Sequence, residues 1–223
     1  MNKLEMGLSS VPGDLAAPVI GIVGGGQLAQ MLICAAKNRG VDVVVQTASK
    51  KDPAANQASS VILASSDDIA GTRRLIEDCL CVTFENEWVN VFELKTLKSK
   101  GSHFLPTLSS LRPLVDKMEQ RKLLDELNIQ GPDWIRLDSN QISISKLPLG
   151  WNFPLMAKSS RGGYDGKGTR PIKTFNDLVD LIKSVDPAKW FLEKWVSYDY
   201  ELALVVSRDQ KGVIRSFPLV ETY

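Results

Sequence analysis

The glycine-rich segment from Lys158 to Gly168 contains the residues of this sequence that are best suited to chemistry. Four of the seven residues from Gly162 to Gly168 are glycine, and their backbone N–H groups have the freedom to converge on phosphate oxygens. Lys158, Arg161 and Lys167 add positive charge. A Walker P-loop is excluded, because no G-x-x-x-x-G-K-S/T pattern occurs and the flanks indicate strands rather than a helix. The pattern favours a mobile phosphate-binding flap over a plain flexible hairpin.

A second glycine-rich turn, Gly24-Gly25-Gly26-Gln27-Leu28-Ala29, follows an apolar strand and opens a predicted helix. It matches G-x-G-x-x-A, in which backbone N–H groups and the helix dipole can hold an anion. A dinucleotide site also requires an acidic residue about 20 residues later, and Gln46 and Thr47 stand there instead. The sequence therefore disfavours NAD. A site for a phosphate-bearing substrate and a purely structural turn are the two remaining interpretations.

The apolar segment from Trp190 to Val196 precedes a carboxylate, Glu201. Apolar side chains can enclose a purine ring, and a carboxylate can accept hydrogen bonds from ribose hydroxyls. Because the segment follows the glycine-rich loop, it is a candidate for binding a nucleoside. An ordinary core strand with a solvated Glu201 is the alternative.

The segment from Thr83 to Glu87 lies at the predicted carboxyl end of a strand in a parallel sheet. Ligands of open parallel sheets bind at these ends. Glu85 and Glu87 are therefore candidates to hold a substrate amine or ribose, and a solvated strand-to-helix turn is the alternative.

The composition excludes several classes of protein. Of 223 residues, 43% are hydrophobic and 24% are charged, which is close to the globular average and argues against a disordered, collagen-like or coiled-coil chain. The net charge of +1 provides no basic excess for nucleic acid or a membrane surface. No apolar run approaches the ~18–20 residues of a membrane span, and the start of the chain shows no signal peptide.

The few cysteine and histidine residues limit the chemistry further. Cys34, Cys79 and Cys81 have no zinc or disulfide spacing and all lie in apolar stretches, so we expect buried thiols in a reducing cytoplasm. His103 is the only histidine. A histidine-based triad or a multi-histidine metal site within this chain is therefore excluded.

The first half of the chain alternates between strands and helices, which predicts a parallel sheet with right-handed crossovers. Residues 1–17 are expected to be an N-terminal extension, and residues 18–110 a Rossmann-like domain. Apolar residues at helical spacing on the first helix are Leu28, Met31, Leu32 and Ala35. The predicted strands are 19–23, 41–46, 61–64, 80–84 and 103–105, and the predicted helices are 26–39, 67–78 and 89–100.

The pattern changes beyond residue 110 and predicts an α+β domain over residues 111–223. A hairpin is expected around the turn at 209–212, and Asn176 or Asp177 can cap a helix. The abrupt end after a strand suggests an incomplete fold. The predicted helices are 111–127 and 178–185, and the predicted strands are 134–137, 153–158, 170–173, 191–196, 201–207 and 213–220.

These motifs, in this order, resemble the ATP-grasp superfamily and, within it, the 5-(carboxyamino)imidazole ribonucleotide synthetase family of purine biosynthesis. The similarity runs from about Pro18 to Tyr223 and is most specific at Lys158 and the segment Gly162-Gly163-Tyr164-Asp165-Gly166-Lys167-Gly168. The resemblance implies an α/β fold, in which a Rossmann-like parallel-sheet domain precedes a partial ATP-grasp α+β domain that is truncated at its C-terminal end.

The resemblance also implies a reaction. In that family ATP phosphorylates bicarbonate, and carboxyphosphate or its CO2 carboxylates 5-aminoimidazole ribonucleotide to N5-carboxyaminoimidazole ribonucleotide, with release of ADP and phosphate. The chain is thus expected to belong to a cytoplasmic, homodimeric ligase that uses Mg2+. The metal ligands are expected in a part of the family that follows Tyr223, and no metal site is predicted within this chain.

The resemblance further implies roles for individual residues. Lys158 is expected to contact phosphate, Asp165 to close over the reacting amine and carboxyl donor, and Gln27 and Glu85 to lie on the substrate side. The residues expected to bind ATP are Lys117, Lys158, Gly162, Gly163, Tyr164, Asp165, Gly166, Lys167, Gly168, the adenine hinge Glu193, Lys194, Trp195 and Val196, and the ribose-binding Glu201.

Two other functions stay open on the sequence. One is a non-catalytic nucleotide-binding fragment or subunit that requires a partner chain. The other is an ATP-grasp carboxylase or ligase with a different acceptor. Substrate tests separate the second from the synthetase.

Overall fold

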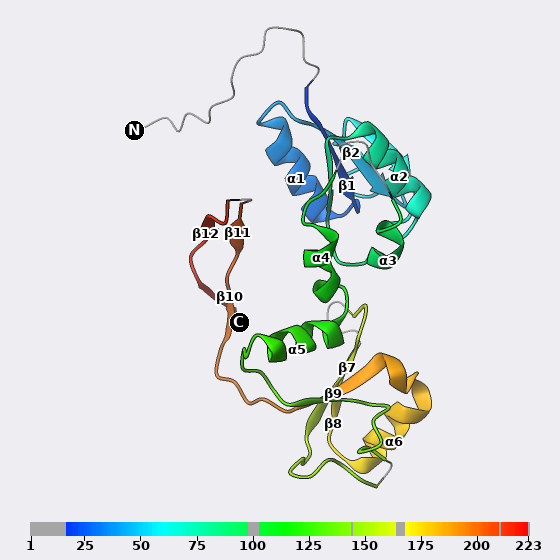
Figure 1. The fold of residues 1–223 in the computed structure, drawn as a ribbon, viewed down its shortest axis with the longest axis vertical. Helices are drawn as coiled ribbons and strands as arrows, with labels where there is room; N and C mark the ends of the chain where they lie inside the picture. Colours follow the sequence, from blue (N-terminus) through cyan, green and yellow to red (C-terminus); the bar gives the residue numbers. More distant parts are fainter. Residues whose placement is uncertain (1–16, 98–102, 144, 164–167, 210, 223) are drawn as a thin grey trace. The chain divides into compact units, whose positions relative to one another are not determined.

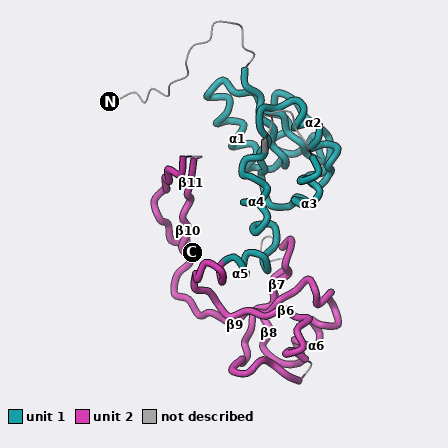
Figure 2. The backbone as a smooth tube through the Cα atoms, in the orientation of Figure 1, with its two compact units in different colours: residues 1–123 teal, residues 124–223 magenta. Residues whose placement is uncertain are grey.

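The computed structural model describes residues 17–97, 103–143, 145–163, 168–209 and 211–222 (Figure 1). They belong to two compact units, Met1–Leu123 and Leu124–Tyr223 (Figure 2). Most of the predicted N-terminal extension lies outside the described residues.

Unit 1 is built on a five-stranded sheet in the order β3-β2-β1-β4-β5, in which each neighbouring pair is parallel. The sheet confirms the predicted parallel α/β architecture. Its strands are β1 (Val19–Val23), β2 (Asp42–Thr47), β3 (Ser60–Leu63), β4 (Cys81–Phe84) and β5 (His103–Phe104), and its helices include α1 (Gln27–Lys37) and α2 (Ile69–Asp78).

Alternate residues of β1 supply two separate cores, because successive side chains of a strand point to opposite faces of the sheet. Ile22 packs with Ala29 and Ile33 of α1, whereas Val23 belongs to the cluster that contains Leu75 of α2. Helices therefore cover both faces of this sheet (Figure 1). Burial on both faces explains why β1 is a nearly continuous apolar run.

The buried face of α1 is not the expected one. Ala29, Ile33 and Ala36 are buried, whereas Met31 is 67% exposed. The small alanines allow the helix to approach the strands, and the larger side chains Leu28, Met31, Leu32 and Ala35 then face outward. For the same reason Cys34 is exposed. Cys81 is half-buried, so the expectation of three buried thiols is confirmed only at Cys79.

Two predicted helices of unit 1 are shorter than expected. The helix expected over 89–100 is the single turn α3 (Val91–Leu94) within the described residues. The helix expected over 111–127 is divided into α4 (Leu108–Leu111), the 3-10 turn η1 (Arg112–Leu114) and α5 (Lys117–Glu126). The proline in η1 lacks an N–H for a continuous helix. Asp116 then starts α5, because its carboxylate accepts from the backbone N–H groups of Met118 (3.0 Å) and Glu119 (3.3 Å).

Unit 2 contains a four-stranded sheet in the order β6-β9-β7-β8 with antiparallel neighbours. One face packs on the helix α6 (Phe175–Ser184), where Leu178 and Leu181 join Leu155, Ala157 and Leu192 of the sheet in a buried cluster. The strands are β6 (Trp134–Arg136), β7 (Leu155–Ser159), β8 (Thr169–Ile172) and β9 (Trp190–Lys194), and the 3-10 turn η2 is Pro187–Lys189.

Helix α6 begins earlier than predicted. Its N-cap is Thr174, and neither Asn176 nor Asp177 holds this position. The Thr174 hydroxyl accepts from the Asp177 N–H (3.2 Å), while the Asp177 carboxylate accepts from the Thr174 N–H (2.9 Å). This reciprocal pair is a capping box, which satisfies N–H groups that have no partner within the helix.

Two short strand pairs complete unit 2 and confirm the predicted hairpin. β10 (Glu201–Ala203) pairs with β13 (Val220–Thr222), and β11 (Val206–Arg208) pairs with β12 (Ile214–Ser216). At the turn, the Asp209 carboxylate accepts from the N–H groups of Lys211 (2.8 Å) and Val213 (2.9 Å). We call residues 201–222 the ribbon; apart from Gly212, every residue described in it is exposed.

Candidate functional site

The predicted site residues lie in both units. Gln27, Glu85 and Lys117 belong to unit 1, and Lys158, the described glycines of the loop, the hinge and Glu201 belong to unit 2. Tyr164, Asp165, Gly166 and Lys167 lie outside the described residues.

In unit 1, Glu85 and the Gly24–Ala29 turn meet at the carboxyl end of the sheet. β1 and β4 are neighbours, so the residues that follow them are adjacent in space. The Glu85 carboxylate accepts from the Gly26 N–H (2.7 Å) and from the Ala29 N–H (3.4 Å). Gln27, the first residue of α1, is exposed beside this contact. The two residues predicted on the substrate side therefore lie at the same edge of the sheet, after the neighbouring strands β1 and β4.

Gln46, which stands near the place of a dinucleotide-binding acid, is a buried structural residue. Its amide nitrogen donates to the carbonyls of Ser65 (2.6 Å) and Asp68 (3.0 Å), and its amide oxygen accepts from the Thr72 hydroxyl (2.8 Å). The neighbouring Thr47 donates to Asp52. Neither side chain provides a free carboxylate for a ribose, which agrees with the argument against NAD.

In unit 2, Lys158 and Glu193 form an ion pair between adjacent strands. Met156 of β7 lies opposite Glu193 of β9, and Lys158, two residues along, shares its face of the sheet. The Lys158 Nζ lies 2.6 Å from Glu193 Oε2, with side-chain exposures of 28% and 3%. The pair holds an ammonium group at the end of β7, directly before the glycine-rich loop.

The described part of the glycine-rich loop has the backbone conformation that glycine allows. Gly162, Gly163 and Gly168 have φ values of 66°, 79° and 80°, which other residues rarely adopt. The two ends of the loop are joined where the Ser159 N–H donates to the Gly168 carbonyl (2.8 Å). A side-chain carbon at Gly168 would also collide with Ser159. These contacts place the described ends of the loop next to the end of β7, which carries Lys158.

Within the hinge, Lys194 points to the opposite face of the sheet from Glu193. Its Nζ lies 2.7 Å from the Asp133 carboxylate and 5.8 Å from the centre of the Trp151 ring. Trp195 and Val196 continue from the strand as exposed residues. A hinge at this position would thus offer backbone groups and exposed apolar side chains, whereas the Lys194 charge is engaged elsewhere.

The last two predicted ATP-binding residues, Glu201 and Lys117, belong to different units. The exposed Glu201 carboxylate accepts from the Tyr198 hydroxyl (2.9 Å), and this hydrogen bond raises the pKa of Tyr198 above its ordinary value. Lys117 is the first residue of α5 and is half-buried.

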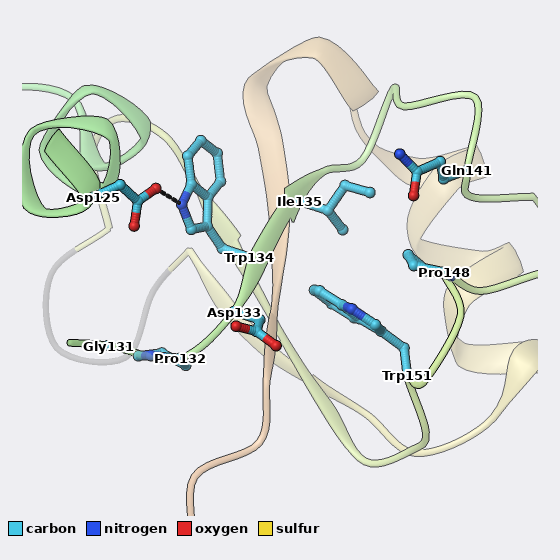
Figure 3. Close-up of a pocket in the computed structure, with 9 residues that line it drawn as sticks. All are labelled: Asp125, Gly131, Pro132, Asp133, Trp134, Ile135, Gln141, Pro148 and Trp151. Carbon is cyan, nitrogen blue, oxygen red and sulfur yellow. Dashed lines mark hydrogen bonds between the residues drawn. The ribbon is translucent and has the colours of Figure 1, made fainter. Parts of the chain in front are cut away.

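Unit 2 also has a pocket of about 450 Å³ that the sequence did not predict (Figure 3). Figure 3 shows Trp134 and Trp151 on either side of it, with Asp133 between them. Its acids are already engaged, because Asp125 accepts from the Trp134 indole N–H (2.9 Å) and Asp133 pairs with Lys194. The two tryptophans come from separate segments, so their spacing gave no signal. The lining residues are Asp125, Gly131, Pro132, Asp133, Trp134, Ile135, Gln141, Pro148 and Trp151.

The described residues contain no group of three or more His, Cys, Asp and Glu side chains that could hold a metal ion. In the same part of the chain, no helix is both long and apolar enough to cross a membrane.

Comparisons with known protein families match almost the whole chain in two consecutive parts. Residues 18–113 match the ribonucleotide synthetase preATP-grasp domain, and residues 122–223 match the ATP-grasp domain. The two models meet close to the boundary between the compact units.

Two curated relatives are named N5-carboxyaminoimidazole ribonucleotide synthase. The protein from Synechocystis sp. is 41% identical over 91% of this chain and 50% of its own length. The protein from Synechococcus elongatus is 37% identical over 92% of this chain and 51% of its own length. The chain therefore spans about half the length of the curated relatives it matches.

A solved structure supports the same likeness. The Staphylococcus aureus N5-carboxyaminoimidazole synthetase complexed with ADP is 30% identical, with a TM-score of 0.82, over 92% of this chain and 55% of that one. Both the fold and the order of the two domains therefore agree with this group of ATP-grasp proteins.

Proposed function

Because this chain belongs to the N5-carboxyaminoimidazole ribonucleotide synthase group of ATP-grasp ligases and matches the N-terminal half of its members, we propose that it is part of an enzyme that carboxylates 5-aminoimidazole ribonucleotide. Bicarbonate and ATP are the other substrates, and ADP and phosphate are released. The observation that carries the proposal is the ordered match of both domains to relatives of that name.

Lys158 and the glycine-rich loop are proposed to bind the ATP phosphates. An ammonium group beside backbone N–H groups stabilises the negative charge that develops on a transferring phosphoryl group. Glu193 is buried and lies 2.6 Å from Lys158, so it orients the ammonium group. Asp165, outside the described residues, is proposed to act on the amine and carboxyl donor.

Mg2+ is included in the proposal because phosphoryl transfer from ATP uses it to offset phosphate charge. The described residues do not fit a metal site on their own, and no step is assigned to the metal. Its ligands are expected in the part of the relatives that this chain does not span.

The proposal also includes a cytoplasmic location and a homodimeric assembly for the enzyme. A cytoplasmic location is supported by Cys34, Cys79 and Cys81, which are free thiols, as expected in a reducing compartment. A homodimer is supported by the exposed apolar side chains of α1, since such surfaces favour association.

A nucleotide-binding part that works only with another chain is the second candidate. It is favoured by the coverage of about half of each relative and by the lack of a metal-binding cluster among the described residues.

Removing the Lys158 charge tests the proposed phosphate site. In Lys158→Met alone, the buried Glu193 would lose its ion pair with Lys158, which destabilises the fold because the buried charge is less well compensated. We therefore combine Lys158→Met with Glu193→Gln and compare this double variant with Glu193→Gln alone, because Glu193 itself belongs to the proposed hinge. This double variant should fold, and ATP-dependent turnover should fall by ~10²-fold or more. ADP release is measured with and without 5-aminoimidazole ribonucleotide, in this chain and in the full-length Synechocystis relative, where the substitutions are made once an alignment has identified the matching lysine and glutamate.

Lys189→Met is the matched control, because Lys189 is an exposed lysine of η2 that pairs with Asp186 at 3.4 Å. It should leave ADP release unchanged. Asp165→Asn should keep ATP affinity but impair carboxylation. Full turnover in the folded double variant, or loss of ATP affinity alone in Asp165→Asn, would refute the assigned roles. The second candidate would be favoured if the relative is active by itself whereas this chain becomes active only after a partner chain is added.

A further inference from the structure

We propose that Glu85 occupies the anion-binding position of the Gly24–Ala29 turn and thereby excludes phosphate groups from it. Glu85 is then a specificity-determining residue, because it decides which end of a substrate can approach the helix. The glycine-rich turn resembles a phosphate site in sequence, but in the folded chain its anion is a side chain of the protein.

The hydrogen bonds show that Glu85 uses two of the backbone donors that a phosphate at this turn would need. α1 has 11 residues, and the N–H groups of its first turn have no partners within the helix. Glu85 Oε2 accepts from the Gly26 N–H at 2.7 Å, and Oε1 lies 3.4 Å from the Ala29 N–H. One carboxylate therefore reaches two donors at the positive end of the helix dipole.

The glycines of the turn are explained by the close approach of Glu85. A side-chain carbon on Gly24 would lie 2.6 Å from both Cβ and Oε2 of Glu85, and one on Gly26 would overlap Oε1. Gly24 also has a φ of 111°. Glycine is required here to admit the glutamate side chain, so the motif does not need a bound phosphate to account for it.

The backbone of the sheet fixes both partners. The Glu85 N–H donates to the Val23 carbonyl (2.9 Å), and the Gly24 N–H donates to the Gln46 carbonyl (2.9 Å). Glu85 is half-buried, which reduces its freedom to move away from the turn.

A second carboxylate adds to the negative charge around the turn. Asp52 accepts from Thr47, and a side-chain carbon on Gly25 would lie 3.2 Å from the Asp52 Cβ. Lys50 and Lys51, on the same loop as Asp52, are exposed, so water and salt screen their charges more than those of the half-buried Glu85 and Asp52. The two carboxylates therefore outweigh the two lysines at the turn and make the approach of a phosphate dianion unfavourable.

If the proposed function holds, this inference also orients the substrate. The phosphate of the ribonucleotide would bind away from the Gly24–Ala29 turn. A hydroxyl or amine could approach instead, because the carboxylate oxygens of Glu85 can accept further hydrogen bonds.

Hydrogen exchange of the 223-residue chain, followed by mass spectrometry, tests the proposal. Peptides that cover β1 and α1 are compared in potassium phosphate and in potassium chloride of equal ionic strength. In the wild type, phosphate should not change exchange of these peptides. In Glu85→Ala, the freed N–H groups should exchange roughly ten-fold faster in chloride, and phosphate should restore their protection.

Glu85→Gln is the second variant, because its amide oxygen can still accept a hydrogen bond without carrying charge. In this variant, hydrogen exchange of the β1 and α1 peptides in chloride should be faster than in the wild type and slower than in Glu85→Ala. Phosphate should slow it. Glu87→Ala removes an exposed carboxylate two residues away and should behave as the wild type does. The proposal is wrong if phosphate protects the wild-type turn, or if a folded Glu85→Ala or Glu85→Gln variant shows no response to phosphate. Since phosphate alone is the probe, these results do not depend on the proposed reaction.

Discussion

Cys34 differs from the other two cysteines in the exposure of its thiol. Cys34 lies on the outward side of α1, and its Sγ donates to the Gln57 side-chain oxygen at 3.1 Å. Burial, with smaller contributions from the nearby Asp78 and Cys81, raises the pKa of Cys79 to about 11. Burial also raises the pKa of Cys81. Since the thiolate is the reactive form, the raised pKa values of Cys79 and Cys81 disfavour reaction there, whereas the Cys34 thiol is exposed to reagents.

We therefore predict that iodoacetamide at pH 8 alkylates Cys34 first. A thiol of pKa about 11 is only about 10⁻³ ionised at that pH, so Cys79 should react at least ~100-fold more slowly. Peptide mass spectrometry over time measures the three rates. In Cys34→Ser the fast phase should disappear, whereas equal rates at Cys34 and Cys79 in the native chain would contradict the assigned burial.

At the scale of the element, the start of α6 depends on the capping box of Thr174 and Asp177. We predict that Thr174→Ala lowers the free energy of unfolding of unit 2 by about 1 kcal/mol, measured by urea denaturation of the whole chain. Asn176→Ala is the control, because Asn176 is an exposed residue of the same turn that the sequence also offered as a cap. A larger loss in Asn176→Ala would show that the helix begins elsewhere.

The stability that the capping box gives to α6 is expected to depend on pH. The backbone N–H of Lys173 and the contacts with Thr174 lower the pKa of Asp177 in the folded chain. A lowered folded-state pKa contributes stability that is present above the unfolded-state pKa and is lost as the pH falls through the folded-state value. Asp177→Asn should therefore be less stable than the wild type near neutral pH, and the difference should shrink below about pH 4. Urea melts at several pH values measure this, and a constant difference would contradict it.

The strands could be predicted because a short apolar run bounded by glycine or polar residues is too short for a typical buried helix and is typical of a buried strand. The buried side of α1 could not be predicted in this way, because Leu28 and Met31 lie at helical spacing just as Ala29 and Ile33 do. The contact of Glu85 with Gly26 spans 59 positions and depends on β4 lying next to β1. The pairing of Lys158 with Glu193 likewise depends on the register of β7 and β9, which local patterns do not specify. The roles of these residues in catalysis stay predictions, as does the domain boundary at residue 110.

At the scale of the whole molecule, exposed apolar side chains gather on α1 and along the ribbon. The ribbon exposes Leu202, Ile214, Phe217 and Leu219, among others. Its strands are only three residues long, and isolated two-stranded pairs are marginally stable in water. Surfaces of this kind favour association.

We predict that this 223-residue chain self-associates through the ribbon. Sedimentation velocity should show concentration-dependent oligomers, and Phe217→Lys should reduce them by placing a charge on the exposed surface. Met31→Lys makes the matched change on α1, the surface that supports the proposed homodimer, and should leave the ribbon-dependent oligomers in place. A monodisperse wild-type monomer would refute the prediction, and conversion to monomer by Met31→Lys alone would show that α1 accounts for all of the association.

The exposure of the ribbon also determines how little the ribbon contributes to the heat capacity of unfolding. The heat capacity of unfolding comes mainly from apolar surface that becomes newly hydrated. The ribbon side chains are already in water in the folded state, so melting the ribbon adds little to that quantity. The heat-capacity step of this chain therefore records the loss of its two sheets and their helices, and a ribbon that had already melted would be almost invisible in it.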